Sequence, residues 1–144
     1  MPYFNDAAEV YANLGTLFQD VMADEELGAR FKTANTIVQY RFRHPDSAVT
    51  VKMLEGEDPQ VDLGPTSLQP EVILAMEADT GHRFWLGQVN VTVALARGEI
   101  NARGPVAKIL RLVPLAGPVF PRYKARLEAA GREDLVLKRV GPPA

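Results

Sequence analysis

The chain has 144 residues, of which 47% are hydrophobic and 24% charged, with a formal net charge of −2 and no cysteine. These values suit one globular domain, residues 1–144, and exclude disulfides and thiolate metal sites. The small negative charge argues against binding to nucleic acid, which requires a basic face. With no secretory signal recognisable at the start of the sequence, we expect a cytoplasmic protein.

Two helices are predicted in the first 35 residues. Asp6 and Glu9 have the spacing of a capping box, and a second, shorter helix is predicted to begin near Asp24. Between these signals, apolar residues recur at helical intervals on one face, namely Val10, Leu14, Leu17, Phe18 and Val21.

The apolar period then changes to two, which is typical of strands. In residues 36–43, Val38, Tyr40 and Phe42 alternate with polar side chains, so they are predicted to share the inner face of a strand. A short turn leads to a second alternating strand at 48–54, so the pair forms an antiparallel hairpin. Further strands are predicted at 60–64 and 71–77, and the last of these reads as an inner strand because it is apolar on both faces.

Short helices and glycine stops dominate the next segment. Asp79 is the predicted N-cap of a helix that Gly87 ends, and Asn90 is the predicted N-cap of a helix that Gly98 ends. A fifth strand follows at 99–103.

The last third of the chain is predicted to be helical. A helix starts at Pro105 and stops at Pro114, and another covers 122–130. The order of elements predicts an α+β fold, in which helices cover one face of a five-stranded, mostly antiparallel sheet.

Catalytic chemistry is sparse. His44 lies in a predicted turn, and His82 follows Asp79 by three residues on a short helix, where we expect a capping Asp and a surface His. No spacing predicts a metal site, a cofactor or catalytic residues, so the sequence favours a protein that is not an enzyme. A small isomerase or cyclase using Asp79 and His82 as an acid–base pair is the less favoured alternative.

Residues 79–110, DTGHRFWLGQVNVTVALARGEINARGPVAKIL, resemble the sterol carrier protein type 2 (SCP2) domain. The resemblance rests on the order and spacing of Asp79, Leu86, Gly87, Ala94, Leu95, Gly98, Ile100, Ala102 and Gly104. It extends loosely over residues 37–77. Gln88 and Glu99 depart from it, because family members often carry Lys there. The resemblance implies an α+β sandwich with an internal lipid tunnel, and a carrier of fatty acids, acyl-CoA, sterols or other lipids.

Hydrocarbon burial explains how such a site can lack polar motifs. Each buried CH2 contributes about 0.8 kcal/mol, so a shaped apolar lining is enough. The expected ligand-binding residues are Val51, Met53, Leu74, Met76, Phe84, Trp85, Val91, Leu95, Ile100, Ile109, Leu110 and Val113. The expected partners are a hydrophobic small molecule and, transiently, a membrane or an enzyme. An interaction or regulatory domain with a vestigial tunnel remains the main alternative.

Overall fold

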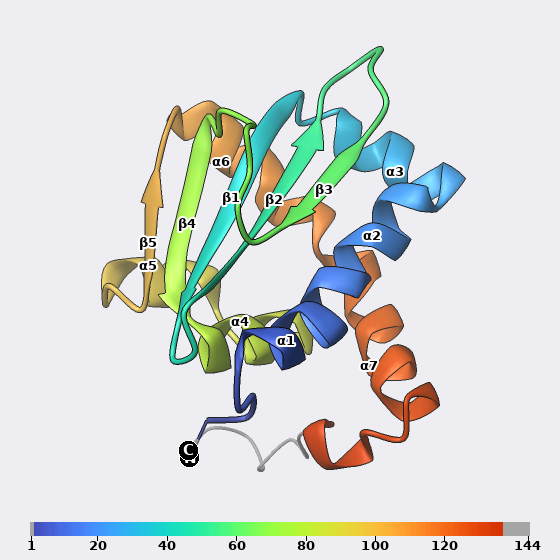
Figure 1. Cartoon of the computed structure of the whole chain (residues 1–144). Helices are drawn as coiled ribbons and strands as arrows, with labels where there is room; N and C mark the ends of the chain where they lie inside the picture. Colours follow the sequence, from blue (N-terminus) through green and yellow to red (C-terminus); the bar gives the residue numbers. More distant parts are fainter. Residues whose placement is uncertain (1, 137–144) are drawn as a thin grey trace.

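The structure is a computed structural model that describes residues 2–136 (Figure 1). Its elements in chain order are α1 (Ala7–Val10), the π-helical turn η1 (Tyr11–Gly15), α2 (Thr16–Ala23), α3 (Glu25–Lys32), β1 (Thr36–Arg43), β2 (Ser47–Met53), β3 (Gln60–Leu63), β4 (Val72–Glu77), α4 (Ala78–Trp85), α5 (Val91–Ala96), β5 (Ile100–Arg103), α6 (Val106–Leu112), the 3₁₀ turns η2 (Val113–Leu115) and η3 (Gly117–Val119), α7 (Phe120–Ala129) and η4 (Glu133–Leu135).

The predicted cap at Asp6 is present, and Asp24 caps the helix that was predicted to begin near it. The backbone N–H of Glu9 donates to Asp6 Oδ1 at 2.9 Å, and that of Leu27 donates to Asp24 Oδ1 at 2.9 Å. Glu9 in turn accepts from the backbone N–H of Asn5 at 2.9 Å. The apolar stripe predicted for the first helix is buried along its whole length. Capping and amphipathic patterning thus start and orient these helices.

The five strands form one sheet with the order β3-β2-β1-β4-β5. Strand β1 pairs antiparallel with β2 and parallel with β4, while β2–β3 and β4–β5 are antiparallel. The predicted α+β fold with a mostly antiparallel five-stranded sheet is therefore confirmed.

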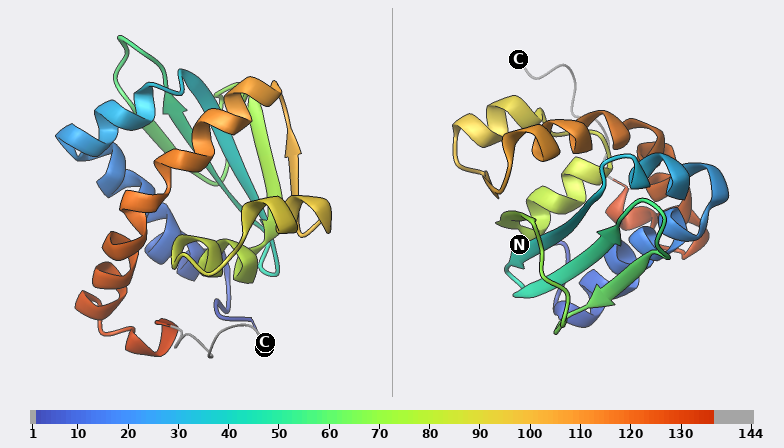
Figure 2. Two further views of the ribbon diagram at one scale, coloured as in Figure 1. Left: turned by 180° about the vertical axis from the view of Figure 1, so that it is seen from behind. Right: turned by 90° about the horizontal axis from the view of Figure 1, so that it is seen from above.

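One face of the sheet is apolar because the strand registers align the alternating side chains. Tyr40 on β1 is opposite Val49 on β2 and Leu74 on β4, and Met76 is opposite Ile100 on β5. The helices lie over this face, as the view from behind shows (Figure 2, left). The single core of the described residues lies between the two layers.

The opposite face of the sheet is polar and is partly covered by the connection from β3 to β4. Residues 64–71 pass in front of β2 and β1 in Figure 1, on the side away from α6. On this face Gln39 donates to Thr50 Oγ1 at 3.0 Å, and Arg41 Nε also donates to Gln39 Oε1. Both Gln39 and Thr50 are buried. The hydrogen bond between them satisfies these buried polar groups. The apolar side chains of the sheet lie on the other face, under the helices.

The helix bounds after β4 differ from the predicted ones. Helix α4 starts at Ala78, so Glu77 rather than Asp79 is its N-cap residue, and Glu77 makes no capping hydrogen bond with its side chain. Helix α6 starts one residue after Pro105, and Pro114 lies inside the turn η2 rather than stopping all helical structure. Asn90 does cap α5, through a 3.1 Å bond from the Val93 N–H to Asn90 Oδ1.

Candidate functional site

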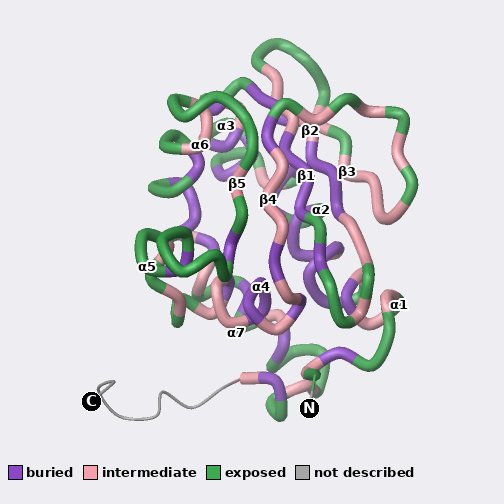
Figure 3. Tube along the Cα trace, turned by 90° about the vertical axis from the view of Figure 1, so that its left-hand side faces the viewer, coloured by how far each residue is buried: buried purple, intermediate pink, exposed green. Residues whose placement is uncertain are grey.

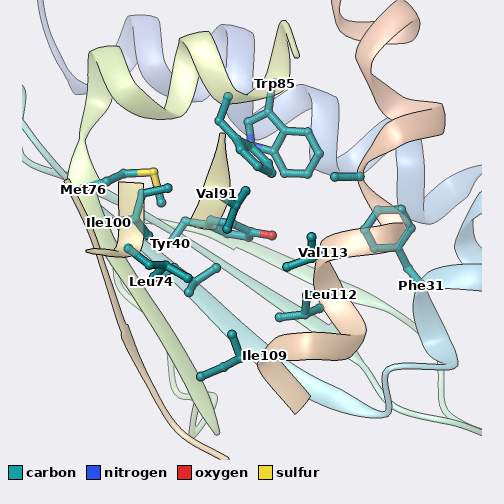
Figure 4. Close-up of a pocket in the computed structure, with 13 residues that line it drawn as sticks. Phe31, Tyr40, Leu74, Met76, Trp85, Val91, Ile100, Ile109, Leu112 and Val113 are labelled. Atoms are coloured by element: carbon teal, nitrogen blue, oxygen red, sulfur yellow. The ribbon is translucent and has the colours of Figure 1, made fainter. Parts of the chain in front are cut away.

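An apolar cavity lies between the sheet and the helices α3 to α6 (Figure 4). Strands β1, β4 and β5 supply its floor, α4 and α5 one wall, and α3, α6 and η2 the other. The lining consists of Phe31, Tyr40, Leu74, Met76, Phe84, Trp85, Val91, Leu95, Ile100, Ile109, Leu112, Val113 and Ala116. Every lining side chain is aliphatic, aromatic or a thioether, so the cavity presents no charged group to a bound molecule.

The cavity reaches the surface between α5 and η2. Leu95 and Val113 line it, yet they expose 37% and 43% of their surface. Three more large apolar side chains are exposed nearby in the chain, Val93 on α5 and Val106 and Leu110 on α6. Figure 3 shows that α5 is exposed along most of its length. We call these five exposed side chains the mouth residues; two of them, Leu95 and Val113, line the cavity itself.

The cavity is narrow. Its volume is about 50 Å³, whereas an apolar cavity that takes benzene in another protein is about 150 Å³ and ligand pockets reach about 300–1,000 Å³. The described residues therefore hold a small apolar cavity open at one side, rather than a tunnel wide enough for a lipid chain. At about 24 cal/mol per Å³, an empty space of this size costs only about 1 kcal/mol.

Nine of the twelve residues expected to contact a ligand line this cavity, namely Leu74, Met76, Phe84, Trp85, Val91, Leu95, Ile100, Ile109 and Val113. Whether they contact a lipid stays a prediction. The structure places the other three elsewhere. Val51 and Met53 are buried on β2, which packs against α3 and lies outside the lining. Leu110 is 65% exposed and faces solvent, with Val106 one turn before it.

Sequence reasoning missed four lining residues. Leu112 was missed because α6 is apolar on several sides, so its pattern leaves open which side faces inward. Ala116 was missed because it lies beyond α6, directly after η2, where no regular pattern indicates an inward side. Tyr40 was predicted on the inner face of its strand but not as a lining residue, and Phe31 lies on the helix predicted to begin near Asp24. Nothing in a single sequence indicates that those faces border a cavity.

Two polar atoms occur in the lining, the hydroxyl of Tyr40 and the indole N–H of Trp85. Neither makes a hydrogen bond within the described residues, although the two side chains are only 6% and 3% exposed. Burial raises the pKa of the Tyr40 phenol well above its usual value, so the hydroxyl stays protonated at neutral pH. The site can therefore offer neutral hydrogen bonds in an apolar setting.

His82 is buried rather than on the surface, which corrects the sequence-based expectation. Its Nε2 donates to the carbonyl oxygen of Leu135 at 2.8 Å, and the hydroxyl of Tyr123 donates to its Nδ1 at 2.7 Å. Burial is the main cause that lowers the pKa of His82, which favours the neutral ring. Asp79 accepts instead from the backbone N–H of Tyr3 at 2.9 Å. Both members of the suggested acid–base pair are thus engaged in hydrogen bonds that join α4 to the two ends of the described chain.

Metal and membrane-spanning features are not found in the part of the chain that the structure describes. Within residues 2–136, no three or more His, Cys, Asp or Glu side chains gather where they could hold a metal ion. None of the helices in this range has the length and apolarity needed to cross a bilayer.

Comparisons with known proteins agree with this architecture. Neither a scan against protein families nor a search of curated sequences finds a match, whereas solved structures do match. The sterol carrier protein domain 2 of Helicoverpa armigera superposes with a TM-score of 0.66 at 17% identity, over 82% of this chain and 91% of that one. Sterol carrier protein 2 from Yarrowia lipolytica, in its apo form, gives 0.56 at 17% identity, over 77% and 87%. Sterol carrier protein 2 like 2 from Aedes aegypti gives 0.54 at 18% identity, over 72% and 92%. The resemblance seen in residues 79–110 is confirmed at the level of the fold.

Proposed function

We propose, from the SCP2 fold of this chain and the apolar cavity beneath its helices, that the protein binds a hydrophobic small molecule and transfers it without catalysing a reaction. The observation that carries the proposal is the composition of the cavity lining, in which no residue is charged. A site for a polar metabolite would need charged or strongly hydrogen-bonding groups. This one offers hydrocarbon surface and two neutral polar atoms.

Binding of a lipid chain requires the cavity to widen. Growth from about 50 Å³ to about 300 Å³ would cost roughly 6 kcal/mol at about 24 cal/mol per Å³ if the new space stayed empty. Burial of a ten-carbon chain offers on the order of 8 kcal/mol gross, at about 0.8 kcal/mol per CH2. A chain of this length or longer can thus hold the cavity open. Without a ligand, the cavity is expected to stay narrow.

Helices α5 and α6 are the elements that we expect to move. The mouth residues lie on these helices and on η2, where apolar side chains already face water. An outward shift of either helix uncovers few buried side chains, since α5 and α6 each have a single buried residue, Ala94 and Leu112. Transient contact with a membrane or an enzyme would cover the same side chains while the lipid passes.

The test is to identify what the protein carries. Organic extraction of protein purified from its native cells, followed by mass spectrometry, should reveal a lipid in near-stoichiometric amount. Protein stripped of lipid should melt at a higher temperature when fatty acids, alcohols or sterols of increasing chain length are added. Absence of both a co-purified lipid and any stabilisation across the panel would refute the proposal.

The narrowness of the cavity favours one alternative, an interaction or regulatory domain in which the tunnel is vestigial. In that case the mouth residues would bind a protein partner permanently. A stable partner recovered by pull-down, together with no response to any lipid, would support this second function.

A further inference from the structure

We infer that the hydroxyl of Tyr40 is a polar anchor inside the cavity, and that the ligand is an uncharged lipid with a hydrogen-bonding oxygen, such as an alcohol or a ketone. This inference rests on the proposed carrier function and narrows the class of cargo.

The first argument is that the hydroxyl lacks a partner in a buried place. Tyr40 is 94% buried, yet its oxygen forms no hydrogen bond within residues 2–136. In the same range, no side-chain nitrogen or oxygen that is fully enclosed lacks a partner. The Tyr40 oxygen therefore keeps some accessible surface, and since Tyr40 lines the cavity, that surface faces the cavity. Figure 4 shows the oxygen pointing away from the sheet toward Val113.

The second argument is that the ring is held in one orientation. It stacks on Phe18 at 4.7 Å between ring centroids and lies parallel to Phe42 at 6.4 Å. The edge of Trp85 approaches it at 6.3 Å. These contacts need only an aromatic ring, so Phe at position 40 would satisfy them equally well. The hydroxyl has no packing role, and leaving a buried hydroxyl unpaired destabilises the empty protein.

The third argument concerns which oxygen would suit the anchor. The Tyr40 hydroxyl can donate and accept, and the Trp85 N–H can donate. Both fit a ketone or an alcohol. A carboxylate would fit poorly, because no basic side chain lines the cavity to compensate for its loss of solvation. A water molecule would also fit poorly, because a buried water normally makes about three hydrogen bonds and the cavity offers two polar partners.

The experiment compares three ten-carbon probes, decane, 1-decanol and decanoate, at pH 8. Trp85 is the single tryptophan of the chain and lines the cavity, so its fluorescence should report binding. Wild-type protein should bind 1-decanol more tightly than decane by roughly 2- to 12-fold, which corresponds to one neutral hydrogen bond. Tyr40→Phe should abolish this preference while leaving decane affinity unchanged. Decanoate affinity should be insensitive to Tyr40→Phe, because its charged end stays at the mouth.

The matched control is Tyr11→Phe. It removes a hydroxyl that lies outside the cavity, where it accepts from the Ala48 N–H at 3.4 Å, and it should leave all three affinities unchanged. Equal affinity for decane and 1-decanol in wild type, or a preference that survives in Tyr40→Phe, would overturn the anchor and leave the carrier function standing. Failure of all three probes to bind would overturn both.

Discussion

Enlarging the cavity should make ligand binding stronger at the same time as it weakens the empty protein. Leu112 is 9% exposed and lines the cavity, whereas Leu14, on the N-terminal turn η1, is fully buried in the core and lies outside the lining. Leu→Ala substitutions in a core cost about 2–5 kcal/mol. We expect about 2–3 kcal/mol for Leu112→Ala, because its side chain already borders open space, and about 3–5 kcal/mol for Leu14→Ala.

The two variants should differ in their response to lipid. Ligand at 100 times its Kd adds about 2.7 kcal/mol to the free energy of unfolding. In Leu112→Ala the ligand can fill the space left by three carbon atoms, which adds up to about 2.4 kcal/mol at about 0.8 kcal/mol per CH2. In Leu14→Ala the new space is not next to the ligand, so the stabilisation should equal that of wild type.

Thermal melts of the three proteins, with and without 1-decanol, measure this difference. For a chain of this size, about 1 kcal/mol corresponds to roughly 4 °C in Tm. With up to about 2.4 kcal/mol of extra stabilisation at about 4 °C per kcal/mol, Leu112→Ala should therefore recover up to about 10 °C more than wild type when lipid is added. Equal lipid-induced shifts in both variants would refute the assignment of the ligand to the space beside Leu112.

Three further predictions concern other parts of the molecule. Stability should fall as the pH drops below about 6.5, because burial lowers the pKa of His82 in the folded state and protons then bind preferentially to the unfolded chain. Urea titrations from pH 8 to 5 should show this slope in wild type but not in His82→Gln. An unchanged slope in His82→Gln would contradict the reasoning. Gly104→Ala should lower the free energy of unfolding by more than about 2 kcal/mol, because φ is 128° and a Cβ would lie 2.5 Å from the backbone oxygen of Glu71, just before β4. Gly98→Ala, at φ 73° with open space around it, should lower it by about 1 kcal/mol, as measured by chemical denaturation. Leu110→Gln should change the free energy of unfolding by less than about 0.5 kcal/mol and leave ligand affinity intact. It should nevertheless slow lipid uptake from vesicles in a fluorescence transfer assay. A loss of affinity would place Leu110 inside the cavity after all.

Local signals in the sequence were reliable wherever one element alone decides the outcome. The caps at Asp6 and Asn90 form as predicted, and the helix predicted to begin near Asp24 does begin there, because each of these signals depends on residues three positions away. The alternating faces of β1 also follow from spacing alone. The same spacing indicated which side chains of β4 and β5 share the face under the helices, although Val51 and Met53 on β2 share that face and lie outside the lining.

The misplaced residues depend on partners far away in the chain. His82 looked like a surface residue because its partners Tyr123 and Leu135 lie 41 and 53 residues later. Asp79 looked like a cap, but its carboxylate is bound by the N–H of Tyr3, 76 residues earlier. Leu110 was chosen over Leu112 because a helix that is apolar on several sides does not indicate its own rotation. No sequence signal indicates the unpaired hydroxyl of Tyr40, because the lack of a hydrogen-bond partner can be seen only in the folded structure.

The parallel pairing of β1 with β4 has a consequence for the order of folding. Strands β1, β2 and β3 follow one another through short turns, so they can pair as soon as the hairpins close, whereas β4 must first return across the sheet. Pairing Val38 with Val72 closes a longer loop than pairing Val38 with Val51, so it costs more conformational entropy. We expect pulse-labelled amide exchange to show protection in β1 and β2 before β4 and β5. Because β4 and β5 form much of the cavity floor, this order implies that the cavity forms only at the last stage of folding.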